Sequence, residues 1–514
     1  MDEFQDKSTL AESPSIPAAV TQASQLPSEL LAAIFIHLSG PQDELLAPGT
    51  PHNVQDLISA THVCKFWRQA AISAPELWAK IKMTNLEGAK AFLERSGVVP
   101  LNVYLHLRPR TRVNYGVLGA VAQHVHRFRQ FTIYALEKLD YNPFALLAKA
   151  APLLERLRIT YPVDFQYHLL FDDQVPQLRK LVLYARNIWL QNHLGNLTSL
   201  HLTLTDIIHS RSQFLPFFDM LRRCPSLEEM FVWWSTWDEV SAGTPIPRTV
   251  PLPQLRRLLL RSFRIENIKY LLHTFDLRND GIAIHLSEVY PYHPDDSPIN
   301  SVQGVFQNEN SSQPSLTSST KLELVFHSQL RIVVLHALGP GFAIRIDMRH
   351  DGPAYDDGVD FTFYDVFPSV TELWVRGSSR WFSKLDGIGR LTALETLVLD
   401  GRGSKLAENF REALSLYHPG TPPCPLLSAI DCHGSELEMQ DIFLLVRARF
   451  NAGSQLDKLR IPSSFIPPPS DISSHVRDVT SLDTSSRESH AYSMELPGFC
   501  FAEDHEWWQP WTSV

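Results

Sequence analysis

The chain has 514 residues, 44% of them hydrophobic and 20% charged, a balance typical of soluble globular proteins with two or three domains. The net charge of −10 argues against a nucleic-acid-binding surface, which would require clustered Lys and Arg. No apolar stretch approaches the roughly 18 residues of a membrane span. The polar start, MDEFQDKSTLAESPS, does not resemble a secretory signal peptide. The composition therefore predicts neither a membrane nor a nucleic-acid partner.

The cysteines are few and widely dispersed, a pattern that favours reduced thiols over a disulfide framework. They are Cys64, Cys224, Cys424, Cys432 and Cys500. Reduced thiols are typical of intracellular proteins, so we expect a cytoplasmic or nuclear location.

In chain order, residues 1–24 are polar and contain prolines, so we expect them to be disordered. Residues 25–82 then carry two helical patterns of apolar residues, separated by a polar loop. In the first pattern, Leu30, Ile34 and Leu38 repeat at the spacing of one helical face. The apolar face of the second pattern consists of Leu57, Ala60, Cys64, Trp67 and Ala71. So short a region does not build a sufficient core alone, and it needs a neighbour to bury against.

These residues resemble the F-box, the motif that docks onto the Skp adaptor of Skp–cullin–F-box ubiquitin ligases. The matching residues are Leu26-Pro27, Glu29-Leu30, Ile34-Phe35 and Leu38, then Val63-Cys64-Lys65, Trp67-Arg68 and Pro75-Glu76-Leu77-Trp78. The loop between the two halves is longer than in many F-boxes. The alternative interpretation is a three-helix cap on a larger fold, with Trp67 as a core residue.

The resemblance implies which side chains contact the adaptor. They are Leu26, Pro27, Leu30, Ile34, Phe35, Leu38, Val63, Cys64, Trp67, Leu77 and Trp78.

A short phrase recurs through residues 83–462: often a proline, then a hydrophobe, two polar residues, a hydrophobe, any residue and a hydrophobe. Examples are PLLERLRI from Pro152 and PQLRRLLL from Pro253. The first hydrophobes of the copies are Phe128, Leu154, Leu178, Leu197, Leu227, Leu255, Leu330, Val370, Leu394, Leu427 and Leu456. Most neighbouring copies lie about 19 to 33 residues apart, which is the range of leucine-rich repeats.

The end of each phrase predicts a short strand with two hydrophobes pointing inward, and helical stretches lie between several phrases. Such units cannot bury their apolar faces singly, so they stack. The pattern resembles leucine-rich-repeat proteins with an N-terminal F-box, of a kind found in fungi. The expected fold is α+β to α/β: a three-helix F-box at 25–82, then an irregular leucine-rich-repeat-like solenoid of short parallel strands and helices at 83–462. A single globular α/β domain is the alternative.

Three further segments have distinct compositions. Residues 291–320 predict a flexible loop, and the Ser/Pro/Asp-rich residues 463–490 predict a mobile linker. Residues 491–514 contain three tryptophans and two phenylalanines, so we expect this aromatic tail to dock on the solenoid.

No motif for catalysis is found: the chain lacks a phosphate-binding loop, a dinucleotide fingerprint, a nucleophile elbow and an H-E-x-x-H pair. His62 with Cys64, and Cys432 with His433, lack a second ligand pair at zinc-site spacing. We therefore expect no enzyme activity, no cofactor and no metal. A hydrolase with an unrecognised site is the remaining enzymatic alternative.

Residues pointing outward from the predicted strands are the candidates for binding a target. They are Arg158, Tyr184, His201, Phe231, Trp233, Arg261, Trp374 and Arg376. Arg, Trp and Tyr are enriched at binding hot spots. Exposed aromatic side chains need cover, which either a partner or the aromatic tail supplies. The arginines permit phosphate recognition, or they are ordinary surface charges.

The sequence therefore predicts a substrate-recognition adaptor: the F-box binds a Skp-type adaptor and, through it, a cullin, while the repeats bind an unknown protein target. Catalysis lies elsewhere in the ligase. The alternative is a leucine-rich-repeat interaction scaffold that acts outside a ubiquitin ligase.

Overall fold

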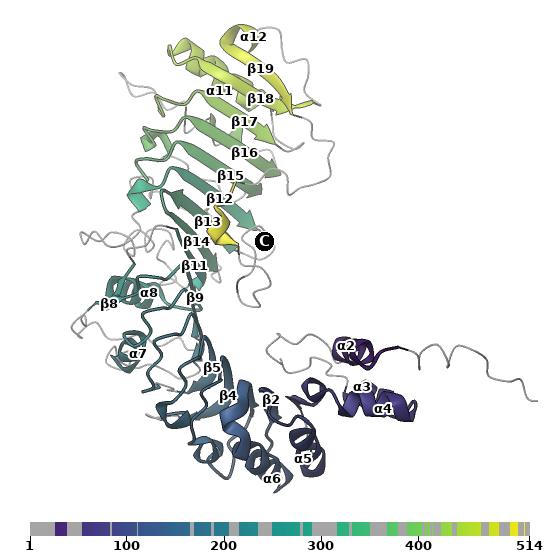
Figure 1. Cartoon of the computed structure of the whole chain (residues 1–514). Helices are drawn as coiled ribbons and strands as arrows, with labels where there is room; N and C mark the ends of the chain where they lie inside the picture. Colours follow the sequence, from purple (N-terminus) through teal and green to yellow (C-terminus); the bar gives the residue numbers. More distant parts are fainter. Residues whose placement is uncertain are drawn as a thin grey trace, which may run out of the picture. The chain divides into compact units, whose positions relative to one another are not determined.

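In the computed structural model the chain forms two units, Met1–Arg158 and Ile159–Val514 (Figure 1). The residues that the structure describes are 26–38, 54–82, 85–109, 112–164, 169–186, 190–204, 215–234, 249–277, 281–289, 316–327, 332–349, 367–378, 388–402, 407–408, 410–411, 414, 423–433, 439–463, 472–482, 494–501 and 508. The predicted disordered residues 1–24 and most of the predicted loop at 291–320 lie outside these ranges.

The first unit is mainly helical, with a small parallel sheet. Its helices are α2 (Ser28–Leu38), α3 (Val54–Thr61), α4 (Lys65–Ile72), η1 (Pro75–Trp78), α5 (Leu86–Arg95), α6 (Arg112–Val121), η2 (Ala122–Arg127) and η3 (Pro143–Leu147). Its strands are β1 (Lys80–Ile81), β2 (Leu101–His106) and β3 (Phe128–Tyr134), where β2 pairs in parallel with both β1 and β3. The division between the units falls within β4 (Arg156–Asp164).

The second unit is built on one large sheet. Its strands, in spatial order, are β5 (Lys180–Arg186), β6 (Ser199–Leu204), β7 (Glu229–Trp234), β9 (Arg257–Arg261), β11 (Ile282–Val289), β14 (Phe342–Arg349), β13 (Ile332–Gly339), β12 (Lys321–His327), β15 (Glu372–Ser378), β16 (Thr396–Arg402), β17 (Ala429–His433), β18 (Leu456–Pro462) and β19 (Val476–Leu482). Neighbours in this order are parallel except where β13 is involved. The sequence-based expectation of a mixed α/β fold with mostly parallel strands is confirmed.

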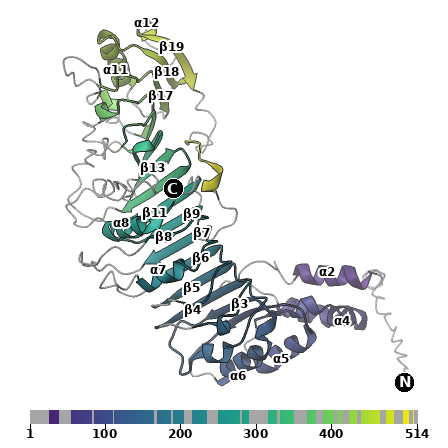
Figure 2. The ribbon, with the colours of Figure 1, turned by 60° about the vertical axis from the view of Figure 1, so that its left-hand side comes forward.

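Helices and short elements connect the strands of this unit. The α-helices are α7 (Leu215–Leu221), α8 (Ile265–Thr274), α11 (Met439–Asn451) and α12 (Ile472–His475). The short helices are η4 (Phe171–Asp173), η6 (Leu316–Ser318), η10 (Ile388–Arg390) and η12 (Gly498–Cys500), and a separate parallel pair joins β8 (Val250–Pro251) to β10 (Phe275–Asp276). Figures 1 and 2 show α7 and α8 on one side of the sheet and η12 on the other.

The alternation of residues along each strand separates two faces of the sheet. On β6, Leu200 and Leu202 are fully buried on the helix side, and the register places them beside leucines of β5 and hydrophobes of β7. His201 lies between them and points to the other face. This second face, which we call the polar face, carries most of the charged and aromatic strand residues. The leucine face forms the core because helices cover it.

The strands β11 to β15 depart from simple sequence order. The phrase at Leu330 predicts a parallel strand, but β13 runs antiparallel between β12 and β14. Consequently β11 pairs with β14 and β12 pairs with β15, both in parallel. The three strands β12, β13 and β14 therefore form an antiparallel meander inserted into a parallel sheet.

The predicted mobile linker at 463–490 contains regular structure. Its residues 472–482 form α12 and β19, and β19 pairs in parallel with β18 along most of its length. Val476 on β19 and Ile472 on α12 are buried. A polar composition misleads here because an edge strand needs only a few apolar contacts, while its outer residues remain in solvent.

Candidate protein-binding surfaces

The helix α2 is apolar on two sides, and only one of them is buried within the unit. Leu31 and Phe35 are fully buried. Leu30, Ile34 and Leu38 lie one helical position away and are 53%, 44% and 48% exposed. Spaced four residues apart, these three form a continuous exposed stripe. A surface helix normally turns polar residues to solvent, so an exposed apolar stripe indicates a partner.

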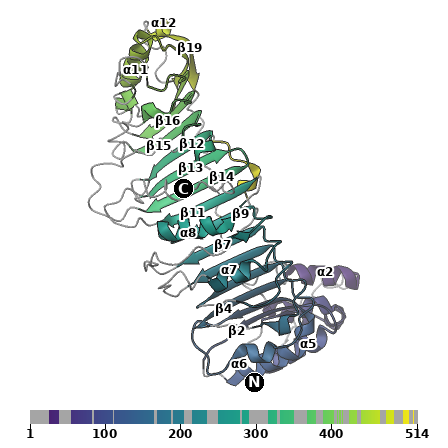
Figure 3. The ribbon, with the colours of Figure 1, turned by 90° about the vertical axis from the view of Figure 1, so that its left-hand side faces the viewer.

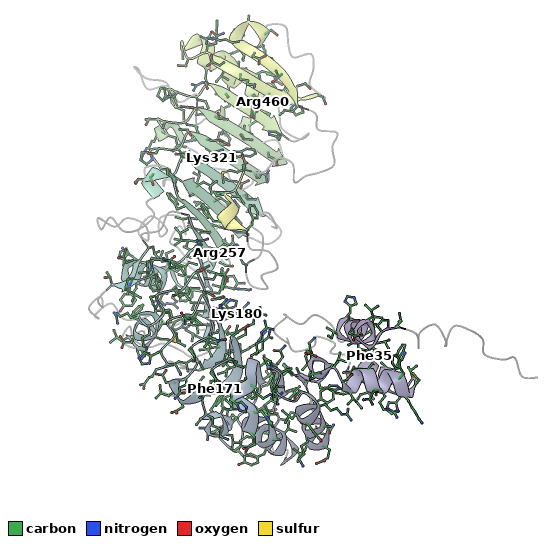
Figure 4. The ribbon with its side chains drawn as sticks, in the orientation of Figure 1. Phe35, Phe171, Lys180, Arg257, Lys321 and Arg460 are labelled. Atoms are coloured by element: carbon green, nitrogen blue, oxygen red, sulfur yellow. The ribbon has the colours of Figure 1, made fainter. Side chains whose placement is uncertain are left out.

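The buried side of α2 packs against α4. The rings of Phe35 and Trp67 are 5.3 Å apart between centroids, and Figure 4 labels Phe35 between α2 and the helices α3 and α4. Cys64 caps α4, because its Sγ accepts a hydrogen bond from the Trp67 backbone N–H at 3.4 Å. Trp67 is thus held from two directions and is only half exposed.

The end of this segment is anchored in the interior. Trp78 is fully buried and donates from Nε1 to the Ala71 carbonyl oxygen at 2.8 Å. Its ring meets the edge of Phe92 at 5.0 Å, and the Arg95 guanidinium lies over it at 4.4 Å. Leu77 is also buried. The apolar helices therefore share a core with α5.

The sequence-predicted adaptor residues fall into three groups. Those exposed to solvent are Pro27, Leu30, Ile34, Leu38 and Val63, and those half exposed are Leu26, Cys64 and Trp67. Phe35, Leu77 and Trp78 lie in the interior. As placed here, the side chains of these last three support the helices whose other sides are exposed, and their direct contact with a partner stays a prediction.

Two further apolar residues of the same segment are exposed to solvent, and neither was among the adaptor-binding residues predicted from the sequence. Phe66 is 40% exposed and Ile72 is 42% exposed. Phe66 precedes Trp67 and lies about 100° away from it around α4, so it leaves the face that Trp67 occupies, a signal available from spacing alone. Ile72, with His62, Arg68 and Trp78, lines a cavity of about 370 Å³ beside α5.

The polar face of the second unit carries most of the target-binding candidates, but it does not leave all of them open. Phe231 is fully buried, and His201, 1% exposed, meets the Phe231 ring edge at 4.6 Å. Tyr184 is 37% exposed. Trp233 lies beneath the Arg261 guanidinium at 4.8 Å, and Trp374 stacks on His433 with ring centroids 6.4 Å apart. Arg158, on β4 at the end of the first unit, is half buried.

The arginine candidates on this face are already paired with carboxylates. Arg261 reaches Glu288 at 2.9 Å, and Arg376 reaches Glu323 at 3.2 Å. These cross-strand pairs satisfy the guanidinium charges locally. Of the two roles left open by the sequence, ordinary paired charge fits these arginines better than phosphate recognition.

No group of three or more His, Cys, Asp or Glu side chains within the described ranges is arranged to hold a metal ion. In the same part of the chain, no helix combines the length and apolar character required to cross a bilayer.

Comparison with known families finds a match for the segment that contains α2. The family model described as F-box-like matches residues 23–84, which include α2, α3, α4 and η1. No curated protein matches the chain. F-box domains generally bind Skp-type adaptors. The chain therefore carries an F-box-like protein-interaction domain near its N-terminus, as the resemblance implied.

Proposed function

We propose that this protein is a substrate-recognition adaptor of a Skp–cullin–F-box ubiquitin ligase. The F-box-like domain binds a Skp-type adaptor, which links the chain to a cullin. The second unit, a leucine-rich-repeat-like solenoid in this proposal, holds a protein target. The chain has no catalytic role of its own: it supplies proximity and orientation for ubiquitin transfer by its partners, in the cytoplasm or the nucleus.

One observation carries the proposal: the exposed stripe of Leu30, Ile34 and Leu38 on a helix inside the F-box-like match. Burying a Leu or Ile side chain at an interface stabilises it by about 1.5–3 kcal/mol. Val63 and Phe66, 57% and 40% exposed, add apolar area in the same domain. The family match supports a Skp-type adaptor as the partner, and the exposed stripe supports α2 as part of the contact surface.

An affinity measurement tests this contact. The double variant Leu30→Glu, Ile34→Glu places two charges in the stripe. Because both positions are exposed, the unfolding free energy should change by only about 0.5 kcal/mol per site. Loss of about 3 kcal/mol of interface burial should weaken adaptor binding roughly 100-fold. The measurement is the affinity for a purified Skp-type adaptor by calorimetry.

The matched control is Val98→Glu, which adds a charge at a position 91% exposed in the same unit. It should bind the adaptor as the wild type does. Adaptor binding that survives the double variant would show that the stripe is not the contact. If binding is confirmed but removing the protein leaves the abundance of co-purifying proteins unchanged, the chain acts as a scaffold outside a ligase.

A further inference from the structure

On the polar face, one row of side chains at matching positions of neighbouring strands changes from charged to apolar in the middle of the sheet. The strand register aligns, from β7 to β15, Glu229, Arg257, Ala283, Ala343, Leu338, Lys321 and Glu372. Its outer members form ion pairs, Glu229 with Arg257 at 2.6 Å and Lys321 with Glu372 at 3.0 Å. The three central members are apolar, and two of them are alanines. Figure 4 labels Arg257 and Lys321, which bound the apolar stretch on either side.

The C-terminal segment fills this apolar stretch. Met494, Cys500 and Trp508 are at most 2% exposed and pack with the central residues of the row. We call the sheet side of this cluster the apolar patch: Phe231, Leu259, Ala283, Leu338 and Ala343. Figure 3 shows η12 of this segment lying beside the strands around β14.

The Trp508 ring is the main anchor. It lies 5.8 Å from the Phe231 ring and 6.1 Å from the His285 ring between centroids. Its Nε1 donates to the Cys500 carbonyl oxygen at 2.6 Å, so the indole N–H is satisfied within the segment. A large ring fits here because the neighbouring strand positions are alanines.

The sheet also contacts the backbone of the segment. Arg257 donates from Nη1 to the Phe501 carbonyl oxygen at 3.1 Å. Hydrogen bonds to the main chain beside pockets for side chains are one way in which proteins recognise peptides. The contacts thus depend on the segment's backbone and on a few apolar side chains.

The segment reaches the patch from a distant strand. Between β19, which ends at Leu482, and β13 there are six strand steps of ~4.8 Å, or about 29 Å. The chain from Leu482 to Met494 can span at most about 40 Å. The segment therefore joins the patch as a tethered element and not as a neighbouring strand.

We propose that the apolar patch is a binding site for a hydrophobic peptide that contains a helical turn, and that the segment carrying Met494, Cys500 and Trp508 is its resident ligand, supplied by the chain itself. A segment with the same pattern of thioether, thiol and indole side chains binds in trans when the resident one leaves. The short tether gives the resident segment an effective concentration on the order of 1 mM. A free peptide at about 10 µM should therefore occupy only on the order of 1% of intact chains.

Cutting the tether tests the proposal in the full chain. A protease site is placed within residues 483–490, and the probe is a fluorescent synthetic peptide of residues 491–514. Before cleavage, 10 µM probe should bind a negligible fraction of chains. After cleavage, excess probe should exchange with the released segment and bind stoichiometrically, a gain of roughly 100-fold. A probe carrying Trp508→Ala should bind at least tenfold more weakly.

Two substitutions on the polar face provide matched controls. Ala343→Glu fills the patch and should abolish probe binding after cleavage. Thr396→Glu, on β16 in the same row but outside the patch, should leave it unchanged. Probe binding that is absent after cleavage, equal before and after cleavage, or insensitive to Ala343→Glu would overturn the proposal. The experiment requires no adaptor, so its result is independent of the proposed ligase function.

Discussion

His285 is a buried titratable side chain on the polar face. Its side chain is 7% exposed, and its Nε2 lies 2.8 Å from an Asp347 carboxylate oxygen. Arg345 donates to the other Asp347 oxygen at 2.8 Å. Burial lowers the pKa of His285, against the opposing pull of Asp347, while Arg345 and His336 act with burial. The imidazole is therefore neutral at pH 7, with its Nε2–H donated to Asp347.

This arrangement makes stability depend on pH. The folded-state pKa of His285 lies below its unfolded value of about 6.5, so the unfolded chain binds more protons as pH falls through that range. As the pH decreases below about 6.5, the unfolding free energy should decrease. This group contributes at most about 1.4 kcal/mol per pH unit to that decrease. Burial opposes ionisation of Asp347, but His285 and Arg345 still hold the pKa of its carboxyl below the usual range. The stability that the ionised Asp347 contributes is therefore lost only at much lower pH.

The measurement is denaturant unfolding at pH 7.5 and 5.5 for the wild type and for His285→Asn. The variant should lose less unfolding free energy between the two pH values, because it lacks the group that titrates. Equal losses would show that other histidines account for the acid sensitivity.

At the scale of elements, arginines link three of the helices to preceding loops. In three places an arginine within or just after a helix donates to a backbone carbonyl 28, 33 and 26 residues earlier, close to the spacing of the repeated phrases. The pairs are Arg127 with Val99, Arg223 with Leu190, and Arg449 with Pro423. Carbonyls of loops near the core need partners, and a guanidinium serves several at once.

Arg449→Met tests this role. Arg449 is 2% exposed and also donates to the carbonyls of Cys424 and Leu427. Leaving these acceptors unpaired should reduce the unfolding free energy by about 1–3 kcal/mol, measured by urea denaturation. The control is Arg477→Met, which removes an exposed ion pair with Asp457 and should cost less than about 0.5 kcal/mol. Equal effects of the two variants would contradict the role assigned to Arg449.

At the scale of the whole molecule, folding hides most of the thiols. All five cysteines are free, and four of them are buried. Burial raises the pKa of Cys224, Cys424 and Cys500 to about 12, and it also raises that of Cys432. A thiol in this state reacts slowly, because the thiolate is the nucleophile.

Titration of the native chain with a chromogenic disulfide should therefore show about one fast thiol, Cys64, and the remaining four only after denaturation. Cys64→Ser should remove the fast phase, although loss of this helix cap also affects α4. A fast phase of several thiols in the native chain, with cooperative unfolding intact, would contradict the described burial.

Much of the fold could be predicted from local sequence patterns. Hydrophobes two residues apart mark a strand wherever one face is buried, so the phrases at Leu197 and Leu227 end in the strands β6 and β7. The F-box-like segment was likewise recognisable, because its apolar spacing and its Leu-Pro and Pro-Glu-Leu-Trp ends are close in sequence. Both signals depend on neighbours within a few residues.

Other features required the tertiary structure. Ile34 and Phe35 are both apolar and adjacent on one helix, and only packing against Trp67 decides that Phe35 is the buried one. The reversal of β13 depends on pairing with strands before and after it, which its own hydrophobes do not specify. The covering of Ala283 and Ala343 by Trp508 joins positions more than 150 residues apart. The sequence by itself determined the strand faces and the F-box-like helices, since those follow from local periodicity. Only the tertiary structure decided the exposed stripe, the strand order and the occupied apolar patch, because they depend on contacts between residues that are distant in sequence.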